Sequence, residues 1–197
     1  PKRANQMRVR GVGPVPCTTT IVGPYPGYEE DRTGVPFSGR SGQELERLLD
    51  GANLPDRKNF YITNLHKEYR GRDYVYSTED IDSAFPLLLR ELGKVKPSTI
   101  VTLGREVTRL FLGDVDITDV EGIPWHIKSG QTVYPLVHPA AGMRNSELSP
   151  YVVRGFQALA TFLGGEVEPR ILFDDPYQEP DYRLLAGEEV WQMLGKY

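Results

Sequence analysis

The sequence predicts one α/β domain with three layers, in which helices cover both faces of a central parallel sheet of four strands. Strand-like and helix-like segments alternate along the chain, and this alternation is typical of parallel sheets covered by helices. The predicted strands are short runs rich in β-branched residues. A chain of 197 residues, 39% of them hydrophobic, is long enough to bury one good core.

Each of the four predicted strands ends at a residue that is unusual in a core. In chain order the strands are TTTIVG ending at Gly23, NFYITN ending at Asn64, STIVTLG ending at Gly104 and TVYPLVH ending at His138. Open parallel sheets bind ligands in the crevice beyond the carboxyl ends of their strands. These four strand ends are therefore expected to point toward one pocket.

Helical patterns lie between and after the strands. They are GQELERLLDGA from Gly42, STEDIDSAFPLLLRELGKV from Ser77, REVTRLFLG from Arg105 and SPYVVRGFQALATFLGG from Ser149. Ser77 followed three residues later by Asp80 is typical of a capping box, and Pro97 is expected to end that helix. The final glycine pair indicates the carboxyl end of the last helix.

The composition divides the chain into three parts. Residues 18–165 are expected to form the domain, residues 1–17 an N-terminal extension, and residues 166–197 a C-terminal linker or strap rich in Asp, Glu and Pro. Two arrangements stay open for the last part. It joins the domain to a further one in a longer chain, or it folds back on the body through the apolar residues Ile171, Leu172, Phe173 and Trp191.

Charge, hydrophobicity and cysteine content argue against several classes of protein and of metal site. A net charge of −4 argues against a protein that coats nucleic acid with a generally basic surface, but it permits local basic patches. No apolar run approaches the roughly 20 residues of a membrane span, and no secretory signal is evident, so we expect a cytoplasmic monomer without a membrane partner. The single cysteine, Cys17, excludes an internal disulfide and an all-cysteine metal site within this chain.

The stretch GPYPGYEEDRTGVPFSG, residues 23–39, is expected to form the pocket floor with free backbone N–H groups facing a ligand. Phe37 is placed to stack on a flat ring, Asn64 offers a donor and an acceptor, and His138 offers a ring nitrogen. Together they describe a pocket for a planar polar ring such as a nucleobase. By residue type alone each has a structural alternative: a core phenylalanine, a turn-capping asparagine or a loop-bonding histidine.

Five blocks follow one another between about residues 18 and 165: GPYPGYEED, GVPFSGRSG, YITNLHK, PSTIVTLG and HPAAGMR. Their order and spacing resemble the uracil-DNA glycosylase superfamily, most closely its thermophile-type family 4 branch. The resemblance implies that the chain has the fold of this superfamily and that it is a DNA-repair enzyme. Such an enzyme flips uracil out of DNA and hydrolyses its N-glycosidic bond, leaving an abasic site.

The resemblance also implies roles for single residues in the pocket. His138 would stabilise the negative charge that grows on the leaving uracil. Asn64 would read the polar edge of the base, Phe37 would stack on it, and Gly27 would let the backbone approach. The substrate-binding residues expected in this way are Pro24, Tyr25, Gly27, Phe37 and Asn64, and the catalytic ones are His138 and Asn64.

Contacts to DNA are expected from two places. Lys67, Arg70 and Arg72 form a basic cluster beside the pocket, which is either a set of phosphate contacts or an ordinary solvated loop. By resemblance, Met143 would act as a wedge in the duplex and Arg144 as a phosphate or groove contact.

The chain departs from the family pattern at three places. Pro24 and Tyr25 stand where the family or its related branches place a residue that positions the attacking water. Glu29, Glu30 or Asp31 is then the substitute, or, because the family pattern already has acids at the last two of these positions, they organise the loop. Glu68 and Ala84 stand where two of the four cysteines of an iron–sulfur cluster are expected, so no cluster and no other cofactor or metal is predicted. Ala140 follows the HP dipeptide where serine is usual.

Three functional classes follow. The first is the glycosylase. The second is a catalytically weak or inactive DNA-binding module of the same fold, within a larger replication or repair protein, and the missing carboxylate at positions 24 and 25 favours it. The third is a flavodoxin-like nucleotide-binding protein.

Overall fold

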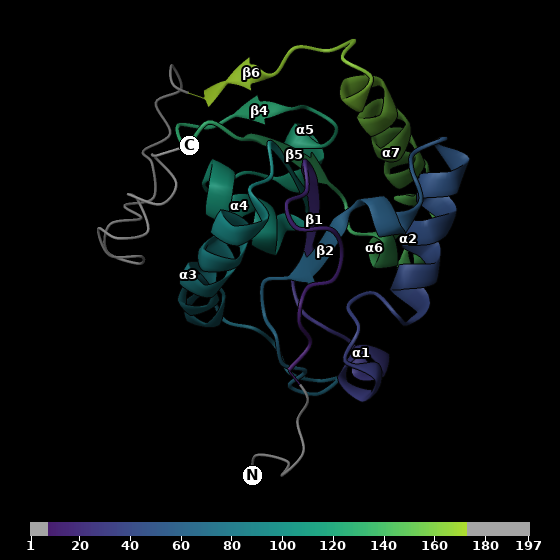
Figure 1. Ribbon diagram of the computed structural model, residues 1–197. Helices are drawn as coiled ribbons and strands as arrows, with labels where there is room; N and C mark the ends of the chain where they lie inside the picture. The colour runs from purple at the N-terminus through teal and green to yellow at the C-terminus, as the bar shows by residue number, and fades with distance from the viewer. Residues whose placement is uncertain (1–7, 173–197) are drawn as a thin grey trace.

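A computed structural model describes residues 8–172 (Figure 1). Its sheet has the strand order β2-β1-β3-β5-β4-β6. The four central strands are β1 (Thr19–Gly23), β2 (Tyr61–Asn64), β3 (Thr99–Leu103) and β5 (Thr132–Leu136). They run parallel to one another and correspond to the four predicted strands.

Two further strands extend the sheet beyond β5. Strand β4 (Trp125–His126) pairs antiparallel with β5, and β6 (Arg170–Ile171) pairs parallel with β4. The predicted central sheet of four parallel strands is therefore confirmed, and two short strands that the sequence did not reveal make the whole sheet mixed and six-stranded. Strands of two residues have no periodic pattern by which a sequence reveals them. Strand β6 belongs to the segment expected as a linker or strap, and the apolar residues Phe173 and Trp191 of that segment lie outside the described residues.

Helices cover both faces of the sheet, which confirms the predicted three layers. The helices are α1 (Tyr28–Thr33), α2 (Arg40–Gly51), α3 (Thr78–Val95), α4 (Arg105–Leu112), α5 (Ile117–Val120), α6 (Pro139–Arg144) and α7 (Ser149–Leu163), with a short 3₁₀ helix at Arg57–Asn59. In Figure 1, α3 and α4 lie on one side of the sheet, and α2, α6 and α7 on the other. None of the helices between residues 8 and 172 has the length and apolar character of a membrane span.

Side-chain alternation along the strands builds the two cores. Ile21 packs in the cluster formed with α2 and α7, whereas its neighbour Val22 packs in the cluster formed with α3 and α4. Successive residues of a strand point to opposite faces, so β1, β3 and β5 each contribute to both clusters. This double burial holds the carboxyl ends of the strands in fixed positions.

The predicted capping box of α3 is confirmed. The backbone N–H of Asp80 donates to Ser77 Oγ at 3.1 Å, and the N–H of Ser77 donates to Asp80 Oδ2 at 3.0 Å. The helix ends at Val95, and Lys96 follows in the left-handed region with φ 56° directly before Pro97.

The segment before β1 lies along the edge of the sheet. Val9 is buried, and its N–H donates to the carbonyl of Lys67. Val12 forms an antiparallel bridge with Ile62 of β2. Part of the segment expected as an N-terminal extension thus packs against the strand that carries Asn64.

Candidate active site

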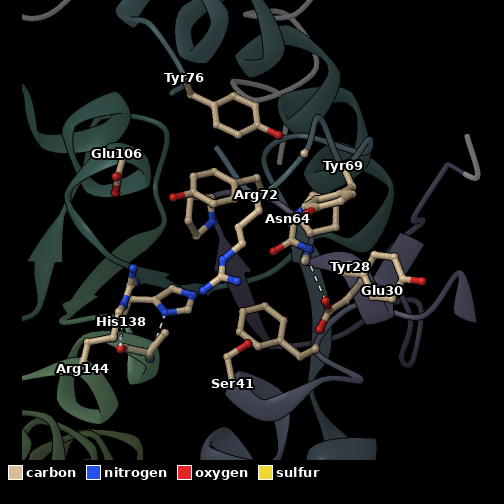
Figure 2. A pocket seen from close by; sticks show the side chains of 17 residues that line it. Tyr28, Glu30, Ser41, Asn64, Tyr69, Arg72, Tyr76, Glu106, His138 and Arg144 are labelled. Atoms are coloured by element: carbon tan, nitrogen blue, oxygen red, sulfur yellow. Dashed lines mark hydrogen bonds between the residues drawn. The ribbon is translucent and has the colours of Figure 1, made fainter. Parts of the chain in front are cut away.

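A pocket of about 380 Å³ opens at the carboxyl ends of the parallel strands (Figure 2). Asn64 reaches it from the end of β2 and His138 from the residues after β5. Among the residues expected from the sequence, the pocket is lined by Pro24, Tyr25, Gly27, Phe37, Asn64, Arg72, His138 and Arg144. Residues distant in the chain therefore meet where the strand ends predicted a site.

Phe37 is held in the pocket through its backbone. It has φ 53°, and its carbonyl oxygen accepts a hydrogen bond from Arg57 Nη1 at 2.8 Å. A Cβ on Gly42 would stand 1.7 Å from that carbonyl oxygen, so only glycine permits α2 to approach so closely. The second glycine of the GRSG motif thus serves to place an aromatic ring.

Asn64 presents an unpaired acceptor. Its side chain is 2% exposed, and within residues 8–172 its Oδ1 has no hydrogen-bond partner. A Cβ on Gly23 would stand 2.5 Å from this oxygen and 2.6 Å from Phe37 Cζ, so glycine is needed there as well. Because a buried acceptor without a partner is costly, this oxygen favours a ligand that supplies an N–H group.

His138 is fixed in one tautomer by the helix that it caps. Its Nδ1 accepts a hydrogen bond from the backbone N–H of Ala140 at 3.1 Å, at the start of α6. Burial, with a smaller contribution from the positive charge of Arg144, lowers the pKa of His138 to about 4. At neutral pH the imidazole is therefore uncharged, with its proton on Nε2. The ring lies nearly parallel to Phe37, with 5.9 Å between centroids.

Glu30 organises the glycine-rich stretch. It is 4% exposed, and its two oxygens accept hydrogen bonds from the backbone N–H groups of Gly27 and Gly39, each at 2.9 Å. The stretch contains helix α1. The expectation that the backbone N–H groups of this stretch face a ligand was therefore wrong at both glycines, because both N–H groups donate to the carboxylate of Glu30.

The predicted DNA-contacting residues separate into two groups. Lys67 forms an ion pair with Glu91, and its ammonium is largely buried, so the structure gives no support for a phosphate contact there. Arg72 and Arg144 both line the pocket, and Figure 2 shows the side chain of Arg72 reaching into it. Met143 is exposed on α6 but does not line the pocket.

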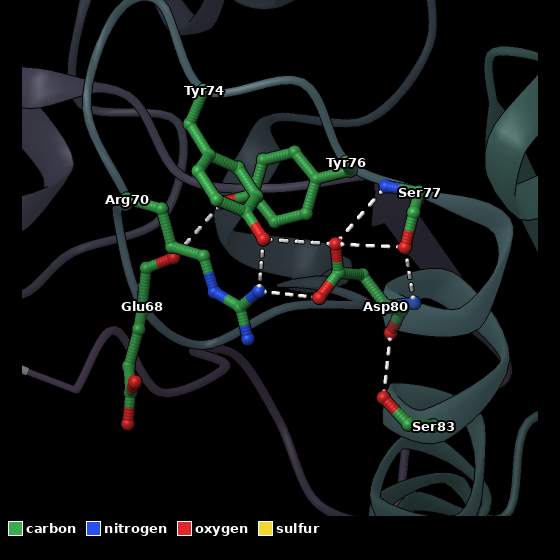
Figure 3. Close-up of polar contacts among 7 residues, drawn as sticks. All are labelled: Glu68, Arg70, Tyr74, Tyr76, Ser77, Asp80 and Ser83. Carbon is green, nitrogen blue, oxygen red and sulfur yellow. Dashed lines mark hydrogen bonds and ion pairs between the residues drawn. The ribbon is translucent and has the colours of Figure 1, made fainter.

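Arg70 belongs to a network that ties the segment after β2 to α3 (Figure 3). Its Nη1 donates to Asp80 Oδ1 and to the hydroxyl of Tyr74, which in turn donates to Asp80 Oδ2. The N–H of Ser77 and the guanidinium of Arg70 hold the pKa of Asp80 well below its usual range. Arg70 is thus engaged within the protein and does not line the pocket.

The donor atoms of this chain do not fit the iron–sulfur cluster of the family 4 branch. Cys17 is the one cysteine in the sequence, and it is buried. Its thiol donates to the carbonyl of Thr19 at 3.2 Å. Glu68, at one expected cysteine position, lies beside the network of Arg70 and Asp80, and its carbonyl accepts a hydrogen bond from Tyr76. Side-chain hydrogen bonds thus hold a segment that a cluster would otherwise join to α3.

An aromatic stack covers one side of the pocket. Tyr25 stacks on Tyr76 with 4.4 Å between ring centroids and 11° between ring planes, and Tyr76 also contacts His66 at 4.4 Å. Burial raises the pKa of Tyr76 to about 12. His66 is buried.

Sequence reasoning missed several lining residues, namely Tyr28, Ser41, Tyr69, Tyr76 and Glu106. Tyr69 and Tyr76 come from a segment without regular structure, where no periodicity indicates which side chains turn inward. Glu106 was detectable in principle. It follows β3 within two residues of Gly104, at the same sheet edge as Asn64 and His138.

Comparison with known proteins agrees with this geometry. Residues 11–160 match the model of the family described as "Uracil DNA glycosylase superfamily". The type-4 uracil-DNA glycosylase of Thermotoga maritima is 32% identical over 162 residues, covering 80% of this chain and 84% of that protein. The type-4 uracil-DNA glycosylase of Pyrobaculum aerophilum is 32% identical over 173 residues, covering 81% and 84%. From the family match, these identities and the pocket at the strand ends, we conclude that the chain belongs to the uracil-DNA glycosylase superfamily.

Proposed function

We propose that this protein is a uracil-DNA glycosylase, which draws uracil out of the DNA stack and hydrolyses its N-glycosidic bond. One observation carries the proposal: a neutral histidine, an unpaired asparagine oxygen and an aromatic ring converge in one pocket. The relatives named as type-4 uracil-DNA glycosylases support the same activity. We also propose that the protein needs no metal or cofactor for it.

The pocket suits the uracil ring. Uracil has an N–H donor between two carbonyl oxygens, so Oδ1 of Asn64 accepts from that N–H while the amide nitrogen donates to a neighbouring carbonyl. Cytosine has an acceptor at the same ring position and would leave Asn64 Oδ1 unpaired. Phe37 covers a face of the base by stacking. A volume of about 380 Å³ accommodates one base.

His138 stabilises the leaving group. When the bond between C1′ and N1 breaks, its electron pair moves to uracil, which becomes an anion, while the sugar acquires oxocarbenium character. The Nε2–H of His138 donates to the oxygen on which this charge grows, and a donor already in place needs no reorganisation. Water then adds its hydroxyl to C1′, and its proton balances the uracil anion, which leaves an abasic site.

The pocket rim provides contacts to the DNA strand. Arg72 and Arg144 line the pocket and are suited to phosphates on either side of the extruded nucleotide. Met143, 43% exposed on α6 beside Arg144, is suited to fill the space that the base leaves in the stack.

A second candidate is a module of the same fold that binds uracil-containing DNA without turnover. The observation in its favour is that Pro24 and Tyr25 line the pocket without supplying a carboxylate. Substrate binding would then be retained, and the hydrolytic step would be lost.

The deciding experiment uses an oligonucleotide with a single uracil. The protein is incubated with it and alkali-labile abasic sites are quantified, with thymine and cytosine oligonucleotides as controls. We expect cleavage at uracil and at least a tenfold loss in Asn64→Ala and Phe37→Ala, with Asn59→Ala, which lies outside the pocket, as a matched control. Binding without cleavage after long incubation would favour the second candidate, and absence of both would overturn each of them.

A further inference from the structure

Glu106 is a carboxylate in the pocket without an assigned role. It lies in the first turn of α4, directly after β3, and Figure 2 shows its carboxylate facing the pocket. Within residues 8–172 this carboxylate forms no hydrogen bond and no ion pair. Glu30 also lines the pocket, but both of its oxygens are bound to backbone N–H groups. Glu106 is therefore the carboxylate of this lining that is available to a ligand or to water.

Gly104 keeps the space between Glu106 and His138 open. A Cβ on Gly104 would stand 3.3 Å from Glu106 Oε2 and 3.5 Å from His138 Cβ. The glycine has φ 93°, a conformation that also favours glycine at the turn from β3 into α4. The carboxylate thus lies near His138, because Glu106 follows β3, His138 follows β5, and these two strands pair in parallel.

Glu106 also acts electrostatically on Tyr25, which stands at a position where this chain departs from the family motif. Burial raises the pKa of Tyr25, and the negative charge of Glu106 raises it further. Tyr25 itself is held in the pocket wall by its stack on Tyr76. A negative charge is therefore supplied near position 25 by a residue of helix α4.

We propose that Glu106 is a catalytic carboxylate of this pocket, which accepts a proton from the water that attacks C1′ and so replaces the group absent at positions 24 and 25. This inference rests on the proposed glycosylase function. The C1′–N1 bond breaks with its electron pair moving to uracil. The water oxygen then bonds to C1′ and its proton passes to Glu106. Glu106 releases that proton to solvent, and the uracil anion takes one from solvent.

The first test is Glu106→Gln, which keeps the size of the side chain but removes its charge and its ability to accept a proton. We expect single-turnover excision to fall about 10²- to 10³-fold, within the range of general-base catalysis, with the Kd for uracil DNA unchanged within about twofold. Glu79→Gln is the matched control, because Glu79 occupies the first turn of α3 and lies outside the pocket. It should excise at the wild-type rate.

A second test distinguishes proton transfer from a structural role. Azide attacks carbon without releasing a proton, so added azide should restore turnover of Glu106→Ala and yield the azido sugar. His138→Ala, which lacks the leaving-group donor, should not respond.

Each outcome of these tests either supports or overturns the catalytic role of Glu106. An active wild type with an equally active Glu106→Gln overturns the role of Glu106 and leaves the proposed function intact. A Glu106→Gln variant that loses DNA binding, or a Glu106→Ala variant that azide does not restore, also overturns it. A wild type that excises no uracil overturns the proposed function and this role together.

Discussion

The backbone N–H of Ala140 donates to Nδ1 of His138 across 3.1 Å. This single hydrogen bond has two effects. It caps the first turn of α6, which begins with Pro139, and it leaves Nε2 as the nitrogen that carries the proton of the neutral ring. The position of a helix terminus thus determines which hydrogen-bond donor the pocket presents.

The two effects of His138 can be separated by mutation. In His138→Asn the amide oxygen retains the cap but no donor reaches the base, so we expect uracil excision to fall about 10²- to 10³-fold without a loss of stability. His138→Ala should lose the same activity and, in addition, about 1 kcal/mol of unfolding free energy. Single-turnover assays and urea unfolding measure the two quantities. His126→Asn, on β4, is the control, and equal excision by His138→Asn and wild type would refute the donor role.

Gly42 should be far less tolerant of substitution than Gly51 of the same helix. A methyl group on Gly42 would collide with the Phe37 carbonyl, whereas a Cβ on Gly51 meets nothing within 4 Å. We expect Gly42→Ala to lower the unfolding free energy by about 1 to 3 kcal/mol and to weaken uracil-DNA binding through Phe37. Gly51→Ala should be neutral or slightly stabilising. Similar stability of the two variants, measured by chemical denaturation, would contradict this account of the Phe37 turn.

The segment between β2 and α3 should depend on Arg70 and not on a metal. Arg70→Gln removes the donor that bridges Tyr74 and Asp80, so amide hydrogen exchange between residues 68 and 77 should accelerate. The purified protein should be colourless and contain no stoichiometric iron, and a chelator should leave its exchange unchanged. Arg47→Gln, which removes an exposed pair on α2, is the control. Bound iron would contradict the prediction.

Stability should decrease on acidification partly through His66. Burial, and to a lesser extent the charge of Arg70, lowers its pKa to about 4 in the folded state, against about 6.5 when unfolded. Between these values the unfolded chain binds a proton that the folded chain does not, so the unfolding free energy falls as the pH drops below about 6.5 and this loss ends near pH 4.

His66→Gln removes this contribution. Between pH 7.5 and pH 5 the variant should lose about 2 kcal/mol less unfolding free energy than the wild type, as measured by urea unfolding at both pH values. An identical pH dependence in both proteins would show that His66 does not titrate in this way.

The sequence by itself determined the parts of this protein that depend on local chemistry. Runs of β-branched residues located the four parallel strands, and the spacing of Ser77 and Asp80 located the start of α3. The rule that strand ends converge was sufficient to bring Asn64 and His138 together, and the five motif blocks identified the family. These inferences need only neighbouring residues or a general property of parallel sheets.

The tertiary structure decided which chemically similar side chains reach the pocket. Arg70 and Arg72 are two residues apart in one basic segment. Arg70 forms an ion pair with Asp80, whereas Arg72 lines the pocket. Glu30 and Glu106 are both acidic residues that line the pocket. The two carboxylate oxygens of Glu30 accept hydrogen bonds from backbone N–H groups, whereas the carboxylate of Glu106 remains available to a ligand or to water. Partners distant in the chain determine such outcomes, because a side chain's hydrogen bonds and burial depend on how separate elements pack, and no local pattern records that packing.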